Sequence, residues 1–193
     1  MIFKGIFKKD IELKPQVVFM GDSITEEWLI YNKQFFDDNN FKNCGISGQV
    51  TRQMLNRFRK DVIKPSPGLV VISGGTNDIA NEIEWSKTKT NLTEMAKMAA
   101  ENNIKVVICS IHPVYRYPWN QNIKPTVLIP QYNTEIKEIC DQNNYHYVDY
   151  YSKMVAGNGG MRSEFTTDGV HCTKEGYAIM KQVIQPIIDD ILQ

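Results

Sequence analysis

The chain has little of what marks a protein that binds nucleic acid or crosses a membrane. Lysine and arginine total 22, and aspartate and glutamate also total 22, so the formal net charge is zero. Without an excess of one charge, no strong field attracts nucleic acid or an anionic membrane surface. No apolar run approaches the roughly 20 residues that a membrane-crossing helix needs. We therefore expect no nucleic-acid partner and no membrane span.

Cysteine is also scarce, and its spacing argues against a metal centre. The four cysteines form no C-x-x-C pair and lie far apart, at Cys44, Cys109, Cys140 and Cys172. A zinc site needs clustered ligands, so we expect no metal. We interpret the cysteines as free thiols of a reducing compartment, with two disulfides as the alternative.

The first residues, MIFKGIFKKDIELK, contain no apolar segment long enough to be a signal peptide. This favours the cytoplasm, and a signal already removed is the alternative that would place the protein outside it.

The length of 193 residues predicts one domain over residues 1–193. The sequence makes no prediction of the oligomeric state.

What the chain does have is a regular alternation of apolar runs and helical patterns. Continuous apolar runs, rather than alternating ones, are typical of parallel strands covered on both faces. We therefore predict an α/β domain with a mainly parallel sheet. Strands are expected at 17–20, 40–44, 68–73, 104–110 and 145–149, and helices at 51–60, 86–102, 127–143 and 173–192. Pro186 is expected to kink or split the last helix.

The stretch FMGDSITEEW, after the first expected strand, has two interpretations. Ser23 and Glu26 match a capping box, in which the serine hydroxyl accepts a hydrogen bond from a helix amide. Ser23 could instead be a nucleophile, because ligands of such sheets bind at the carboxyl ends of the strands. This stretch alone does not decide between the two.

Polar loops after the other strands supply the remaining groups of an acyl-transfer site. His171 is one of only three histidines, and Asp168 lies three residues before it. An imidazole held by a carboxylate can act as a general base on a hydroxyl. The Ser23 amide, the Gly48 amide and the Asn77 side chain could donate to an oxyanion. When each of these residues is considered alone, it is also typical of an ordinary turn or helix end.

Four short motifs in this order resemble those of the SGNH hydrolases, also called GDSL-type esterases and lipases. They are GDSIT, NCGISG, GGTND and DGVH. The resemblance implies a three-layer α/β/α sandwich of flavodoxin-like type with a five-stranded, mainly parallel sheet. It implies Ser23 as nucleophile, His171 as base oriented by Asp168, and an oxyanion hole of Ser23, Gly48 and Asn77. It also implies ester hydrolysis without a metal or cofactor.

The sequence departs from the family at the residues that flank His171. Val170 and Cys172 stand where leucine and proline are more common in the family. Cys172 is a rival nucleophile, but no oxyanion loop belongs to it. We therefore keep Ser23 as the expected nucleophile.

The substrate is expected to be a small-molecule or carbohydrate ester with a short acyl group, such as acetyl. The segment HPVYRYPW is rich in aromatic residues and proline, and we expect it to wall the pocket. Its alternative role is to fold its aromatic side chains onto the protein body. The expected substrate contacts are Asp22, Trp28, His112, Tyr115, Arg116 and Trp119.

Three alternative functions remain open from sequence alone. A lysophospholipase or thioesterase would use the same mechanism on another ester. A flavodoxin-like module could bind phosphate or flavin at the helix that follows GDSIT. A third alternative is a protein that binds glycans without cleaving them.

Overall fold

The computed structural model describes residues 14–193, and the expectation about a signal peptide concerns a segment outside the described residues. Five parallel strands form one sheet in the order β2-β1-β3-β4-β5. The strands are β1 Val17–Gly21, β2 Phe41–Gly45, β3 Leu69–Ser73, β4 Lys105–Cys109 and β5 His146–Val148. The prediction of a parallel α/β sheet of five strands is confirmed.

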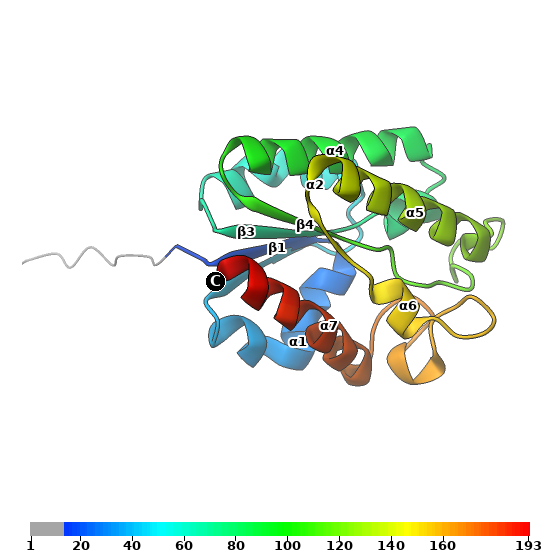
Figure 1. The fold of residues 1–193 in the computed structure, drawn as a ribbon. Helices are drawn as coiled ribbons and strands as arrows, with labels where there is room; N and C mark the ends of the chain where they lie inside the picture. Colours follow the sequence, from blue (N-terminus) through cyan, green and yellow to red (C-terminus); the bar gives the residue numbers. More distant parts are fainter. Residues whose placement is uncertain (1–13) are drawn as a thin grey trace, which may run out of the picture.

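Helices cover both faces of this sheet, which makes three layers (Figure 1). The longer ones are α1 Ser23–Asp37, α2 Thr51–Phe58, α4 Trp85–Glu101, α5 Pro125–Asn143 and α7 Lys174–Leu192. Short helical segments are η1 Arg59–Ile63, which is a π-helix, α3 Thr76–Ala80, α6 Tyr150–Met154 and η2 Ser163–Phe165. Helix α7 runs on through Pro186, so the expectation that proline splits it is wrong.

Along β1, β3 and β4, the side chains alternate between two hydrophobic cores. Val17 and Phe19 pack with α1 and α7, whereas Val18 and Met20 pack with α2, α4 and α5. Both sets are buried, because successive strand residues point to opposite faces and both faces are covered. Double burial explains why the strands show no polar alternation in the sequence.

The strand order places a crevice at the carboxyl end of β1. The chain goes from β1 to β2 on one side and then to β3 on the other, which creates a topological switch point. Ligands of open α/β sheets bind at such points. A ligand site is therefore expected at the turn between β1 and α1. The expectation of one domain over residues 1–193 stays a prediction.

Candidate active site

The turn from β1 to α1 presents Ser23 as the first helical residue. Asp22 is the N-cap, and its Oδ1 accepts a hydrogen bond from the Ile24 amide at 3.1 Å. Glu26 accepts hydrogen bonds from the amide and hydroxyl of Ser47. The capping-box interpretation of Ser23 and Glu26 is therefore wrong, because Asp22 caps the helix and Glu26 holds the loop after β2.

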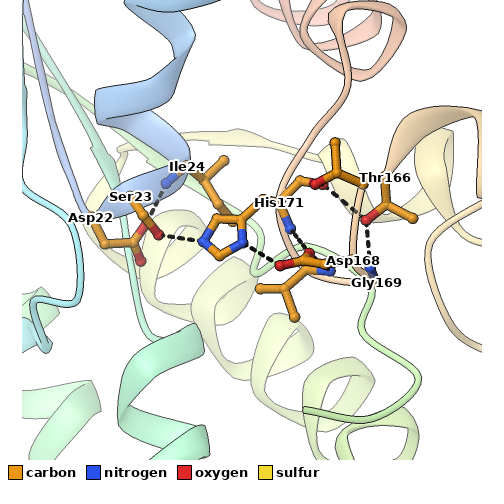
Figure 2. Close-up of polar contacts among 9 residues, drawn as sticks. Asp22, Ser23, Ile24, Thr166, Asp168, Gly169 and His171 are labelled. Atoms are coloured by element: carbon orange, nitrogen blue, oxygen red, sulfur yellow. Dashed lines mark hydrogen bonds and ion pairs between the residues drawn. The ribbon is translucent and has the colours of Figure 1, made fainter. Parts of the chain in front are cut away.

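Ser23, His171 and Asp168 form a continuous hydrogen-bonded chain (Figure 2). Ser23 Oγ lies 3.0 Å from His171 Nε2, and His171 Nδ1 lies 2.7 Å from Asp168 Oδ2. Ser23 follows β1, whereas Asp168 and His171 lie in the loop before α7, and His171 is 148 positions further along the chain than Ser23. The fold thus brings a hydroxyl, an imidazole and a carboxylate into the order that nucleophilic catalysis needs.

The Asp168 carboxylate is held by its own turn. Its Oδ1 accepts hydrogen bonds from the amides of Val170 at 2.9 Å and His171 at 2.8 Å. Gly169 adopts a φ of +90°, which favours glycine and closes this short turn. Partial burial raises the pKa of Asp168, but the hydrogen bonds from His171 and Val170 outweigh it and hold the pKa below its ordinary value. The carboxylate is therefore ionised where it meets the imidazole.

Thr166 supports the same turn, and the sequence analysis missed it. Its hydroxyl accepts a hydrogen bond from the Gly169 amide at 2.8 Å and donates one to the His171 carbonyl at 2.9 Å (Figure 2). A threonine two residues before Asp168 has no sequence signal of its own, because Ser and Thr are common in turns.

The predicted oxyanion donors lie on three segments: Ser23 begins α1, Gly48 lies in the loop after β2, and Asn77 lies in α3. Gly48 has a φ of +74°, and a side chain added there would meet open space. Asn77 lies in α3, and its Nδ2 donates to the Gln49 carbonyl at 3.0 Å. An amide nitrogen carries two hydrogens, so this bond orients Asn77 and leaves a second donor. Gly75, with a φ of +115°, makes the turn that starts α3.

Asp22 and His112 line a small cavity beside Ser23, with a volume of about 10 Å³. Both are buried, with 3% and 2% exposure. Burial raises the pKa of Asp22 to about 7, against the opposing effects of the Ile24 amide and His171. Burial lowers the pKa of His112 to about 4. Such a cavity has room for about one water molecule, so direct substrate contact by these two residues is not supported.

Two aromatic side chains near the site belong to the cores. Trp28 is 1% exposed and stacks with Phe35 and Tyr177. The expectation that Trp28 contacts substrate is therefore wrong. Tyr117 is also buried, and its hydroxyl is 2.9 Å from Thr76 Oγ1. Tyr117 thus anchors the aromatic loop instead of facing the substrate.

The other aromatic residues of that loop face outward. Tyr115 is 55% exposed and Trp119 is 54% exposed, and Arg116 is exposed between them. The Trp119 ring centroid lies 6.5 Å from that of His171. Trp119 therefore lies next to the triad, in the position that a residue lining the expected pocket would occupy.

All four cysteines are buried and free, which agrees with the free-thiol interpretation. Cys172 is fully buried, and its thiol contacts Met180 Sδ at 3.9 Å. Burial raises the pKa of this thiol well above its ordinary value. A buried, protonated thiol is a poor nucleophile, which removes Cys172 as a rival of Ser23.

Two surface clefts lie outside the triad. These clefts, of about 770 and 530 Å³, share Glu82, Ile83 and Glu84. Within residues 14–193, no cluster of three or more acidic, cysteine or histidine side chains could hold a metal ion. None of the helices in the same range is long and apolar enough to cross a membrane.

The sequence profile of the GDSL-like Lipase/Acylhydrolase family matches residues 19–179. The chain therefore belongs to this family of SGNH-type ester hydrolases. The structure of a GDSL-like lipase from Bacteroides thetaiotaomicron VPI-5482 superimposes with a TM-score of 0.89 at 41% identity, over 92% of this chain and 89% of that one.

More distant relatives carry other names. An acetyl xylan esterase, AlAXEase, shares the fold with a TM-score of 0.73 at 20% identity, over 89% of this chain and 98% of its own. The N-acylneuraminate cytidylyltransferase of Escherichia coli O18:K1:H7 is 22% identical over 94% of this chain and 42% of its own length. The chain thus spans about two fifths of that relative.

Proposed function

We propose that the protein hydrolyses a short-chain acyl ester, with acetyl on a carbohydrate as the substrate class. The observation that carries the proposal is the hydrogen-bonded chain from Ser23 through His171 to Asp168. Ser23 Oγ attacks the ester carbonyl carbon while His171 Nε2 takes the hydroxyl proton. The amides of Ser23 and Gly48 and the side chain of Asn77 stabilise the tetrahedral oxyanion.

Three further proton transfers complete the cycle. The tetrahedral intermediate collapses, the bond from carbon to the alcohol oxygen breaks, and His171 returns its proton to the leaving alcohol. A water molecule then attacks the acyl carbon of the acyl-serine while His171 takes a proton from the water. The bond from the acyl carbon to Ser23 Oγ breaks, His171 returns this proton to Oγ, and the carboxylic acid is released. Asp168 accepts from Nδ1 throughout, so that Nε2 faces Ser23 in the form that can accept a proton.

Three observations support a carbohydrate ester. The exposed ring of Trp119 beside His171 offers a flat face on which a sugar ring can stack. An acetyl xylan esterase shares the fold. The matched cytidylyltransferase acts, by its name, on an acylated sugar acid. A lysophospholipase or thioesterase activity would need a cleft for a long acyl chain, and neither of the two clefts lined by Glu82, Ile83 and Glu84 includes a residue of the triad.

The mechanism is tested with a fluorophosphonate probe and peptide mapping by mass spectrometry. We expect the adduct on Ser23, and we expect Ser23→Ala and His171→Ala to remove both labelling and turnover. His146→Ala is the matched control, because His146 is an exposed histidine of β5. Folded wild-type protein that neither labels nor turns over any ester would overturn the proposal.

The substrate class is tested separately with p-nitrophenyl esters of increasing acyl length, acetylated xylo-oligosaccharides, O-acetylated N-acylneuraminate and a lysophospholipid. We expect acetyl esters to be preferred, and sugar acetates to exceed simple alkyl acetates in kcat/KM. A maximum at long acyl chains would instead identify the lipase or thioesterase alternative.

A further inference from the structure

Arg57 lies in the last turn of α2, outside the triad and the predicted oxyanion hole. Its side chain is 13% exposed and makes three hydrogen bonds. Its Nε donates to the Gln49 side chain at 2.7 Å, and its terminal nitrogens donate to the Gly21 carbonyl at 3.0 Å and the Asp61 carboxylate at 2.8 Å. One nearly buried guanidinium therefore joins three separate segments.

Two of these segments carry the predicted oxyanion donors. Gly21 is the last residue of β1, and its carbonyl also accepts the Ile46 amide at 3.2 Å, where the loop with Gly48 begins. Gln49 directly follows Gly48, and its own carbonyl accepts the hydrogen bond from Asn77 at 3.0 Å. The guanidinium thus contacts the nucleophile turn and the glycine loop directly, and reaches Asn77 through Gln49.

The third contact fixes the guanidinium itself. Asp61 belongs to the π-helix η1, which continues α2 with a wider turn. π-Helical turns are rare and occur frequently at functional sites. The Asp61 side chain is only 20% exposed, so this pair is better shielded from water than an ordinary surface ion pair. A planar guanidinium can donate in three directions in one plane, which a lysine ammonium cannot reproduce.

We propose that Arg57 is a positioning residue that holds the nucleophile turn and the Gly48–Asn77 side of the oxyanion hole in register. The inference rests on the proposed function, because it assigns Arg57 to the hole of that reaction. The three hydrogen bonds of Arg57 all go to groups of the protein itself. Its loss should therefore weaken the transition state more than substrate binding.

The first test compares kcat and KM of Arg57→Ala and Arg57→Lys on p-nitrophenyl acetate. We expect kcat to fall at least about tenfold for Arg57→Ala, with KM within about twofold of wild type, and Arg57→Lys to recover only part of the loss. Arg59→Ala is the matched control, since Arg59 is an exposed arginine two residues further on. Thermal unfolding establishes that each variant is folded. If Arg57→Ala fails to fold, Arg57→Lys carries the same comparison.

The second test is a double-mutant cycle with Asn77→Ala. If Arg57 acts through the hole, the double variant should lose little more kcat than Asn77→Ala alone, because residues of one unit are not additive. Fully additive losses, or an unchanged kcat in the folded Arg57 variants, would overturn the inference. Ser23→Ala distinguishes the two proposals: if it keeps turnover, the proposed mechanism has failed, whatever the Arg57 variants show.

Discussion

The Asp22 carboxylate caps helix α1 by accepting a hydrogen bond from the Ile24 amide at 3.1 Å. A helix N-terminus needs such an acceptor, and serine is a common choice. Because Asp22 fills this role, the Ser23 hydroxyl is left to meet His171 at 3.0 Å. The helix cap and the proposed nucleophile are thus adjacent residues with separate hydrogen-bond partners.

Replacing Asp22 by asparagine should change how stability depends on pH. The native pKa is about 7 against an ordinary value of 3.8, so between these values the folded protein binds a proton that the unfolded chain does not. The stabilisation from this proton is complete below pH 4 and is lost as pH rises through 7. Asparagine keeps a neutral side chain that can still cap.

The measurement is the free energy of unfolding in urea at pH 5 and pH 8. We expect the free energy of unfolding of wild type to fall by a few kcal/mol relative to that of Asp22→Asn between pH 5 and pH 8. Each unit of pKa shift corresponds to about 1.4 kcal/mol. A pH-independent difference would show that Asp22 is not protonated in the native state near neutral pH.

Replacing Asp168 by asparagine should lower kcat by on the order of 10³–10⁴. The asparagine amide would donate toward His171 Nδ1, so that Nε2 would carry the hydrogen and could not accept the Ser23 proton. Steady-state kinetics on p-nitrophenyl acetate measure the loss, and circular dichroism verifies the fold. A decrease of less than tenfold would mean that His171 is oriented by something other than Asp168.

Replacing Trp119 by alanine should lower activity on sugar esters and leave activity on simple esters unchanged. With the ring removed, we expect kcat/KM for an acetylated xylo-oligosaccharide to fall about fivefold, which corresponds to about 1 kcal/mol of aromatic contact. Acetate release from methyl acetate should be unchanged. Tyr115→Ala, another exposed aromatic of the loop, is the comparison variant, and equal losses on both esters would argue against a sugar contact.

Replacing Trp28 by alanine should destabilise the fold by about 3–5 kcal/mol, because a fully buried aromatic leaves a cavity. Urea unfolding measures this loss, and Trp119→Ala serves as the exposed control with little expected change. A Trp28→Ala variant as stable as wild type would contradict the placement of this side chain in the core.

The strands were predictable because burial on both faces leaves continuous apolar runs in the sequence. Helices α3 and α6 were not, since five residues are too few to show a helical stripe. Trp28 was misassigned because nearness in sequence to Ser23 was taken as nearness in space. Five helical positions rotate a side chain by about 140°, which turns Trp28 toward the core.

Some residues of the candidate site were likewise predictable from the sequence, and others were not. Ser23, His171 and Asp168 carry distinctive chemistry at strand ends, so their types and positions predicted the contacts that the structure shows. Arg57 and Asp61 stand four residues apart on a helix, a spacing typical of exposed ion pairs. The contact of Arg57 with Gly21 depends on how α2 packs on the sheet, and no local pattern encodes it.

The separation of 148 residues between Ser23 and His171 also has a consequence for biosynthesis. Chains leave the ribosome at roughly 5–20 residues per second, so Ser23 emerges about 7–30 s before its base. During that interval a nascent chain holds a serine with no imidazole partner, whatever part of the sheet has already formed. The hydrogen-bonded chain of Ser23, His171 and Asp168 therefore cannot form until the loop before α7 has been synthesised.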